Sequence, residues 1–325
     1  MIEDLNGARV LVTGGAGLVG SHIVDALVDE GAEVIVYDSL IRGQAGHIAD
    51  AISRGEVQLI RADIRDRDQL QKVMPGVDYV FHQAAAWLRQ CQTEPRLSVD
   101  VNIVGTFNVL EACVDHGVKK LVAASSSSVY GEGLYLPTDE DHPYNNDLFY
   151  GASKVANEQY YRAFHKKYGL DYVAFRYLNV YGPKQPTEAA YMDVIMHFLN
   201  RIFADEAPQI HGDGTATVDL VYVGDVARAN IMALKSDVTN EFFNVASEKP
   251  TSIKELADLL IRICGKEGQL EPELIPRDND LVTHRLGSAK KAREMLGFEV
   301  TTSVEDGMRR VVEWYKQEKQ IVGEN

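Results

Sequence analysis

Two side chains able to share a proton stand four residues apart in the sequence, Tyr150 and Lys154. On a helix this spacing places both side chains on one face. An ammonium group near a phenol favours the phenolate, so the spacing predicts a lowered pKa for Tyr150 and a base that works near neutral pH. Tyr-x-x-x-Lys also arises by chance, and the alternative is an exposed tyrosine–lysine pair. The serine run at 125–128 supports the catalytic interpretation, because it ends an expected strand and offers a hydroxyl to the same substrate oxygen.

A glycine-rich turn near the N-terminus has the pattern of a phosphate-binding loop. Residues 10–20 run V-L-V-T-G-G-A-G-L-V-G, with glycines at 14, 17 and 20 between an expected strand and an expected helix. Glycine at these places permits a tight turn, close approach of a pyrophosphate and close packing of the helix on the strand. The helix N-terminus adds free N–H groups and a positive dipole for the phosphates. The segment therefore predicts a dinucleotide site.

Residues after the next strands complete this predicted site. Asp38 ends the second strand, where a carboxylate can accept from both adenosine ribose hydroxyls and repels a 2′-phosphate, which favours NAD over NADP. Arg42 lies close enough in the sequence to keep NADP as the alternative. Asp63 could accept from the adenine amino group, or it could be a helix cap before Asp66. We expect His82 to be a packed histidine and not a catalyst.

The first half of the chain alternates short apolar strands with amphipathic helices. Strands that are apolar on both faces and separated by helices predict an α/β fold with a Rossmann-type, doubly wound parallel sheet. We expect strands at 8–13, 33–37, 57–61, 79–81, 120–124 and 172–176, and helices at 18–30, 98–116 and 150–168.

After Asn179, prolines and glycines break the chain into shorter elements. Ser252 and Glu255 have the spacing of a capping box at the start of a helix that runs to Cys264. The other expected elements are strands at 218–223 and 241–245 and helices at 225–234 and 304–320. We expect a dinucleotide-binding domain at 1–178, to which 219–246 returns, and a smaller α/β C-terminal substrate-binding domain made of 179–218 and 247–325.

Composition narrows the range of partners. Apolar residues make up 45% and charged residues 25% of the 325 residues, and the net charge of −15 argues against a nucleic-acid or anionic membrane surface. Cys91, Cys113 and Cys264 lie far apart, which fits a reducing compartment and argues against a disulfide framework or a cysteine-ligated metal site. No apolar run reaches membrane-spanning length. We expect a cytoplasmic protein without a bound metal.

Several segments together resemble the nucleotide-sugar epimerase/dehydratase branch of the extended short-chain dehydrogenases/reductases. They are T-G-G-A-G-L-V-G at 13–20, H-Q-A-A at 82–85, S-S-S-S-V-Y-G at 125–131, Y-G-A-S-K at 150–154, R-Y-L-N-V-Y-G-P at 176–183, G-D-G at 212–214 and V-Y-V-G-D-V-A at 221–227. The resemblance implies a tightly held NAD, a nucleotide-sugar substrate in the C-terminal domain, and a homodimer joined through the helices near 98–116 and 150–168. It also implies that Ser126, four residues before Tyr130, is the catalytic serine beside Tyr150 and Lys154.

The resemblance assigns further residues to the two ligands. Those implied at the cofactor are Gly14, Gly17, Leu18, Val19, Asp38, Asp63, Ile64, Gln83, Ala84, Ala85, Asn102, Ser125, Tyr150, Lys154 and Tyr177. Those implied at the substrate are Trp87, Arg89, Ser127, Asn179 and Arg277.

Two departures from the family pattern bear on the substrate. Val218 stands where the family usually has an arginine on the substrate diphosphate, and Ser127 and Ser128 stand where its 4,6-dehydratases have Asp-Glu. Arg89 could supply the missing charge, meet a sugar carboxylate, or be an ordinary surface arginine. Trp87 could stack on the sugar or the nicotinamide, or pack in the core.

These features favour an NAD-dependent nucleotide-sugar 4-epimerase that works through a transient 4-keto sugar, because the dehydration machinery is absent at 127–128. The alternatives are a UDP-glucuronate epimerase or decarboxylase, a net sugar dehydrogenase or reductase, and a catalytically inactive NAD-binding homologue. Intact Tyr150 and Lys154 argue against the last of these.

Overall fold

The computed structural model of the chain describes residues 4–187, 193–276 and 284–323. Strands and helices alternate through its first half, as predicted. In chain order the elements are β1 (Arg9–Thr13), α1 (Leu18–Asp29), β2 (Glu33–Asp38), η1 (Ala45–Ile48), α2 (Ala49–Arg54), β3 (Val57–Arg61), α3 (Arg67–Val73), β4 (Tyr79–His82), α4 (Leu88–Thr93), η2 (Ser98–Gly105), α5 (Thr106–Asp115), β5 (Lys120–Ser126), η3 (Ser127–Tyr130), α6 (Phe149–Tyr168), β6 (Asp171–Tyr177), β7 (Asn179–Tyr181), α7 (Val194–Phe203), β8 (Gln209–His211), β9 (Thr217–Tyr222), α8 (Val223–Lys235), β10 (Glu241–Val245), β11 (Pro250–Ser252), α9 (Ile253–Ile263), β12 (Glu273–Ile275), α10 (Lys290–Leu296) and α11 (Val304–Gly323).

Seven of the described strands form one parallel sheet in the order β10-β6-β5-β4-β1-β2-β3. The direction of winding reverses between β1 and β4, so the carboxyl ends of these strands border the crevice in which such sheets bind their ligands. This arrangement confirms the predicted Rossmann-type, doubly wound sheet.

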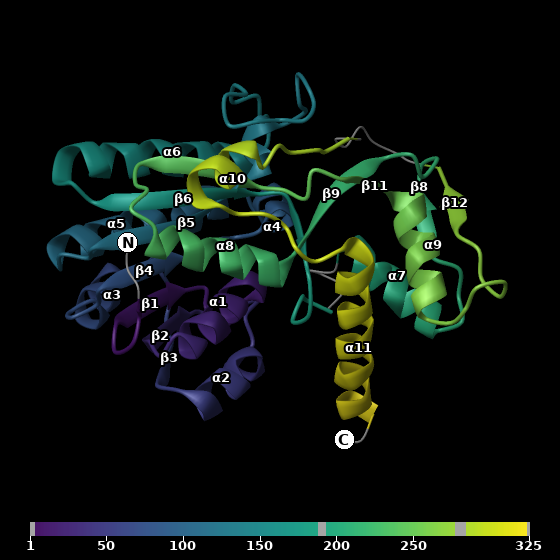
Figure 1. Cartoon of the computed structure of the whole chain (residues 1–325), viewed down its shortest axis with the longest axis horizontal. Coiled ribbons are helices and arrows are strands. Elements are labelled where there is room, and N and C mark those ends of the chain that lie inside the picture. Colours follow the sequence, from purple (N-terminus) through teal and green to yellow (C-terminus); the bar gives the residue numbers. More distant parts are fainter. Residues whose placement is uncertain (1–3, 188–192, 277–283, 324–325) are drawn as a thin grey trace.

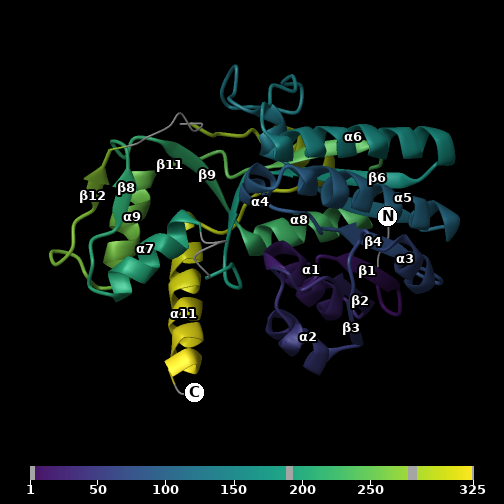
Figure 2. The same ribbon diagram turned by 180° about the vertical axis from the view of Figure 1, so that it is seen from behind.

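Helices cover both faces of this sheet (Figures 1 and 2). On one face, α1 and α8 pack in a core that includes Val24 and Val226. On the other face, α3, α5 and α6 pack in a core that includes Val109 and Tyr161. Because both faces are covered, the strands are apolar along nearly their whole length.

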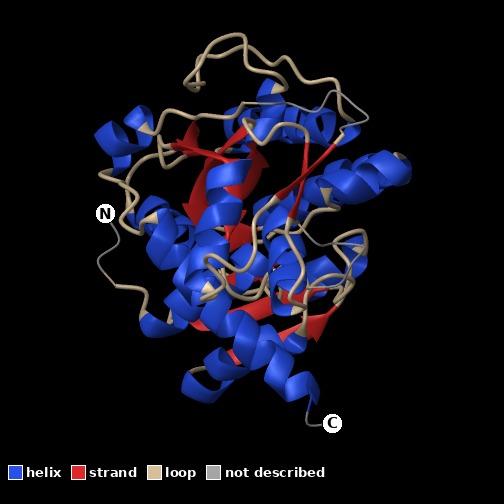
Figure 3. Cartoon of the chain, turned by 90° about the vertical axis from the view of Figure 1, so that its right-hand side faces the viewer, coloured by secondary structure: helices blue, strands red, loops and turns tan. Residues whose placement is uncertain are grey.

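A smaller lobe lies beyond the carboxyl end of the sheet, and Figure 3 views the molecule from its side. It holds a sheet in the order β11-β9-β7 and the pair β12-β8. Phe198 of α7, Leu256 of α9 and Val311 of α11 share the core of this lobe. Within the predicted returning segment 219–246, β10 joins the large sheet, whereas β9 lies in the small one.

Three helices test the sequence patterns closely. The predicted capping box is confirmed, because Ser252 Oγ accepts from the Glu255 N–H (3.1 Å) and Glu255 Oε2 accepts from the Ser252 N–H (2.7 Å). The α8 helix begins at Val223, two residues before its predicted start. The helix predicted at 98–116 begins as the π-helix η2 and continues as α5. At their junction, a Cβ on Gly105 would lie 2.6 Å from Ile64 Cδ1, so a larger residue there would require the Ile64 side chain to move.

Candidate active site

The glycine-rich turn between β1 and α1 has the shape of a phosphate cradle. Gly14 adopts φ +69°, and a Cβ there would lie 2.7 Å from the Ala84 backbone nitrogen. Helix α1 begins at Leu18, and its N-cap Gly17 makes no side-chain cap. The first N–H groups of a helix have no intrahelical acceptor, so those of Leu18 and Val19 are suited to a pyrophosphate.

Asp38 is held rigidly beside this turn. Its carboxylate accepts from the Ala16 N–H (3.0 Å) and from the Leu40 N–H (2.8 Å), and the residue is 7% exposed. Gly43 leaves room for it, because a Cβ at Gly43 would lie 2.9 Å from both carboxylate oxygens. The structure thus fixes an acidic group at the end of β2, where the sequence places the adenosine ribose.

Asp63 follows β3 and pairs with its neighbour Arg65. Asp63 Oδ2 lies 2.8 Å from Arg65 Nη2, and the hydrogen bonds from Arg65 hold the pKa of Asp63 below its usual range. The helix cap belongs instead to Asp66, whose side chain accepts from the Gln69 N–H at 3.0 Å. The alternative that Asp63 is the cap is therefore wrong, and the adenine contact of Asp63 and Ile64 stays a prediction.

The end of β4 carries a buried histidine, as predicted. His82 Nδ1 lies 2.7 Å from Thr13 Oγ1 and its Nε2 lies 2.9 Å from Thr106 Oγ1. Burial and the charge of Lys154 lower the pKa of His82 to about 3, so the ring is neutral at physiological pH. These two hydrogen bonds confirm that His82 is a packed residue.

Gln83, which follows His82, belongs to a separate hydrogen-bonded group around the Tyr177 hydroxyl. Gln83 Oε1 accepts from the Tyr177 hydroxyl (3.1 Å), and the same hydroxyl lies 3.2 Å from Asn230 Oδ1 of α8. Ala84 and Ala85, which follow, have side chains too small to block a ligand. Asn230 was missed by the sequence analysis, since nothing local marks it as a partner of β4 and β6.

Asn102 of η2 has a different environment from the one expected. Its Oδ1 accepts from the Ala86 N–H (2.7 Å), and its Nδ2 donates to the Ala86 carbonyl (3.2 Å) and to Ser153 Oγ (3.0 Å). The carboxamide is fully buried. These contacts fix the loop after β4, and the predicted cofactor contact of Asn102 stays a prediction.

Tyr150 and Lys154 share one face of α6, as their spacing predicts. Lys154 Nζ lies 5.7 Å from the centroid of the Tyr150 ring and donates to the Ala124 carbonyl of β5 at 2.8 Å. Tyr150 is partly exposed, whereas Lys154 is 3% exposed. Ser126 ends β5 and hydrogen-bonds to Ser128 Oγ at 3.1 Å. The structure thus brings the predicted serine, tyrosine and lysine to one end of the crevice.

The predicted lowering of the Tyr150 pKa is wrong for the protein by itself. Burial raises the pKa of Tyr150 to about 12, and a hydrogen bond with Ser126 offsets this only in part. Burial also lowers the pKa of Lys154 to about 8. Desolvation is the largest cause of both pKa shifts, because it disfavours the charged form of each group.

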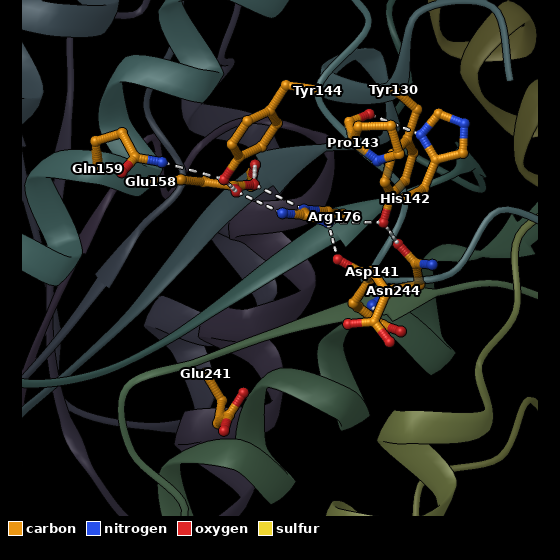
Figure 4. Close-up of polar contacts among 12 residues, drawn as sticks. Tyr130, Asp141, His142, Pro143, Tyr144, Glu158, Gln159, Arg176, Glu241 and Asn244 are labelled. Atoms are coloured by element: carbon orange, nitrogen blue, oxygen red, sulfur yellow. Dashed lines mark hydrogen bonds and ion pairs between the residues drawn. The ribbon is translucent and has the colours of Figure 1, made fainter. Parts of the chain in front are cut away.

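A buried ion pair supports the helix that carries these residues (Figure 4). Arg176 Nη2 lies 2.7 Å from Glu158 Oε2, and its Nε donates to Glu158 Oε1 at 2.9 Å. Arg176 is 3% exposed and Glu158 fully buried. Ser125 Oγ donates to Glu158 Oε1 at 2.5 Å, so its side chain faces this pair. The pair thereby joins the strand end next to Ser126 to α6, one turn beyond Lys154.

The same network reaches the loop after η3 and the edge strand β10. Arg176 Nη1 donates to the Tyr130 hydroxyl (3.0 Å), which donates to Asn244 Oδ1 (2.6 Å). Tyr144 donates to Glu158 Oε2 (2.7 Å), and the Asn244 N–H donates to Glu140 Oε1 (2.6 Å). Glu158 was not predicted as part of the site. Its position four residues after Lys154 on a helix places it on the same face as Lys154 and could have indicated it.

Trp87 lies beside two guanidinium groups at the start of α4. Arg42 lies 5.0 Å from its ring centroid and Arg89 lies 5.6 Å from it. Trp87 is only partly buried, so the alternative that it packs in the core is not supported. Arg89 is exposed. Burial raises the pKa of Asp193, the N-cap residue of α7, and the positive charge of Arg89 opposes that rise.

The remaining predicted substrate residues fall in three places. Ser127 is 7% exposed at the start of η3. Asn179 begins β7, and its buried side-chain oxygen has no hydrogen-bond partner in the part of the chain that the structure describes. Arg277 lies outside the described residues.

The model of the NAD-dependent epimerase/dehydratase family matches residues 10–246. The UDP-glucose 4-epimerase of Mycolicibacterium smegmatis is 35% identical over 318 residues, which cover 96% of this chain and 100% of that protein.

Solved structures agree. The UDP-glucose 4-epimerase of Thermotoga maritima with UDP-glucose has a TM-score of 0.89 at 34% identity, covering 96% of this chain and 99% of that one. The UDP-glucose 4-epimerase of Thermus thermophilus in complex with NAD has a TM-score of 0.84 at 33% identity, covering 95% and 99%.

The chain therefore belongs to the NAD-dependent epimerase/dehydratase family. This confirms the predicted family and makes NAD the cofactor of the site. The residues present fit NAD, since the Gly14 cradle, the bare α1 N-terminus and the fixed Asp38 carboxylate match its phosphates and ribose. No helix within the described ranges has the length and hydrophobicity needed to cross a bilayer. The same ranges hold no cluster of three His, Cys, Asp or Glu residues suited to a metal ion.

Proposed function

We propose that this chain is an NAD-dependent nucleotide-sugar 4-epimerase. The observation that carries the proposal is the grouping of Ser126, Tyr150 and Lys154 at the carboxyl end of the sheet that also carries the dinucleotide cradle, with Ser127 and Ser128 in place of an acid–base pair. Such a site can remove and return a hydroxyl proton while a hydride leaves and returns to the carbon that carries that hydroxyl. It has no carboxylate at 127–128 with which to expel water, so dehydration is disfavoured.

The chain's own residues divide the proton chemistry among them. Tyr150 takes the proton of the sugar 4-hydroxyl, and the Ser126 hydroxyl holds that oxygen in reach. Lys154 is fixed by the Ala124 carbonyl and stabilises the developing phenolate by its charge. NAD in its oxidised form would supply the hydride acceptor and a positive charge. After the 4-keto sugar turns over in the crevice, C4 takes the hydride back on its opposite face and the 4-oxygen takes the proton back from Tyr150, so the product has the opposite configuration.

The raised pKa of Tyr150 fits a base that works only in the loaded site. At about 12, the phenol keeps its proton in the protein by itself. Deprotonation therefore depends on ligands that add positive charge or hydrogen bonds beside it.

We also infer a cytoplasmic homodimer. Val99 and Val104 of η2 are 40% and 46% exposed and Phe149 of α6 is 51% exposed, and these two helices are the ones expected to form the dimer contact. Light scattering after size exclusion tests this, with Val104→Glu and Phe149→Glu expected to give monomers. The cysteines in the described residues form no disulfide, which supports a reducing compartment.

The test of the proposed function is an assay for the interconversion of UDP-glucose and UDP-galactose. The reaction is run without added NAD and monitored by NMR. Turnover without external NAD supports an epimerase, because hydride is returned to the same molecule. Accumulation of NADH would instead indicate a net dehydrogenase. Release of CO₂ from UDP-glucuronate, or epimerisation of that sugar only, would move the assignment to the uronic-acid enzymes.

A further inference from the structure

The buried and partly buried lysine and arginine side chains of this protein differ in whether they have a hydrogen-bond acceptor or a carboxylate as a partner. Lys120 donates to the Ala233 and Ser236 carbonyls, Lys154 donates to Ala124, and Arg176 pairs with Glu158. Within residues 4–187, 193–276 and 284–323, the guanidinium of Arg285 has neither a carboxylate nor a hydrogen-bond acceptor, although the residue is partly buried. Burial lowers the pKa of Arg285, and no neighbouring charge offsets the effect.

The backbone fixes which way Arg285 projects. Its N–H donates to the Thr217 carbonyl at 3.0 Å, and Thr217 and His284 form a parallel bridge. Thr217 Oγ1 lies 3.1 Å from His284 Nδ1, so these two side chains share one face. Because side chains alternate along extended chains, the next residues, Val218 and Arg285, share the opposite face.

A second unsatisfied polar group lies on that face. Asn179 of β7 pairs with Leu220 of β9, which places Asn179 on the same face as Val218 and Arg285. Its buried side-chain oxygen lacks a partner among the described residues. Asn179 stands opposite Leu220 and Arg285 stands opposite Val218. Leu220 and Val218 are two residues apart along β9, a spacing of roughly 6.6 Å.

A partly desolvated cation without a partner is costly, and proteins normally pair it. The chain has 48 acidic residues against 33 basic ones, yet among the described residues none of them neutralises Arg285. An anionic ligand satisfies such a group, and a guanidinium is suited to the paired oxygens of a phosphate.

We propose that Arg285 binds the diphosphate of the nucleotide-sugar substrate and supplies the positive charge that Val218 does not. The inference rests on the proposed function for the class of substrate. A competing cation is Arg89, which is exposed and lies against the Trp87 ring. The other predicted substrate cation, Arg277, lies outside the described residues.

The test is calorimetric binding of UDP to the NAD-saturated protein, with Arg285→Met as the first variant. Methionine keeps the length of the stem and removes the charge. We expect UDP to bind about 10- to 100-fold more weakly, the scale of one charged hydrogen bond. Binding of uridine, followed by ligand-observed NMR, should not change. The melting temperature without UDP should stay the same or rise, because an unpaired charge has been removed.

The matched control restores a positive charge at Val218 on β9, the strand next to Arg285. Val218→Arg in the Arg285→Met background should recover most of the UDP affinity, because positions 218 and 285 share a face. Unchanged UDP binding by Arg285→Met would overturn the inference. Equal losses for UDP and uridine, or a fall in melting temperature with UDP binding intact, would also overturn it, since these results indicate a structural role.

Binding is measured without the chemical step, so the two proposals fail separately. A protein that binds UDP through Arg285 but epimerises no sugar would refute the proposed function and leave this inference standing. A protein that epimerises UDP-glucose while Arg285→Met binds UDP normally would refute this inference alone. Wild-type protein that binds neither UDP nor dTDP would overturn the inference.

Discussion

Arg176 and Arg285 are both withdrawn from water, but their surroundings differ. Arg176, in the large sheet, makes two hydrogen bonds to the Glu158 carboxylate and a third to the Tyr130 hydroxyl. Arg285, beside the small sheet, has none of these in the described structure. The first cation belongs to the scaffold under the catalytic helix, and the second faces the lobe expected to hold the substrate.

The difference separates groups that position from groups that bind. A buried network whose members satisfy one another has no capacity left for a ligand, and removing one member exposes the others to a desolvation cost. A desolvated group without a partner lowers the stability of the free protein and favours the ligand-bound state. Changes in the network should therefore affect folding, and changes in the crevice should affect binding or rate.

The largest effect is expected at Tyr150, which lies on the same helix, α6, as Glu158. Tyr150→Phe should lower kcat by about 10²–10⁴-fold, because it removes the general base. The melting temperature and NAD affinity should match the wild type. Steady-state kinetics on UDP-glucose measure the change, and near-normal activity would refute the mechanism.

Next in size is the loss of the buried carboxylate. Glu158→Gln leaves the Arg176 charge uncompensated in the interior and should destabilise the fold by about 3–5 kcal/mol. Chemical denaturation measures this free energy of unfolding. The matched control is the double variant with Arg176→Met, which should recover much of the loss. If the double variant is less stable than Glu158→Gln, the ion pair is not the cause.

A smaller effect is expected at Arg89, which is exposed at the edge of the crevice. Arg89→Ala should weaken substrate binding by about 1.5–3 kcal/mol, the range for a charged hydrogen bond. If Arg89 contacts a sugar carboxylate, the loss should appear with UDP-glucuronate and not with UDP-glucose. Unchanged KM for both sugars would make Arg89 an ordinary surface residue.

The last effect concerns acid stability and develops only as the pH falls. His82 has a pKa of about 3 in the folded protein, while an unfolded imidazole has its ordinary value of 6.5. The unfolded chain therefore binds the extra proton first, so the stability that neutral His82 provides is lost as the pH falls below 6.5. At pH 5 the loss is about 2 kcal/mol.

His82→Gln should reduce the fall in melting temperature between pH 7 and pH 5 by a few degrees, because glutamine keeps a neutral polar group near Thr13 and Thr106. The slope should not vanish, since burial also lowers the pKa of His22, to about 4. Identical pH profiles for wild type and variant would show that His82 does not set the acid limit.

Local patterns in the sequence determined the elements and several parts of the site. The glycine turn, the capping box at Ser252 and the four-residue spacing of Tyr150 and Lys154 involve neighbours in the chain, so periodicity and residue type suffice to predict them. The packed role of His82 was also predicted correctly, since it lies in an apolar strand.

Only the tertiary structure decided which distant groups meet and what burial does to them. Glu158 and Arg176 come from different elements, Asn102 turns to the Ala86 backbone, and Arg285 reaches the level of Val218 from far along the chain. The pKa of Tyr150 rises where spacing alone predicted a fall. The physical reason is that desolvation and pairing depend on every atom packed around a group, whereas sequence spacing specifies only its nearest neighbours along the chain.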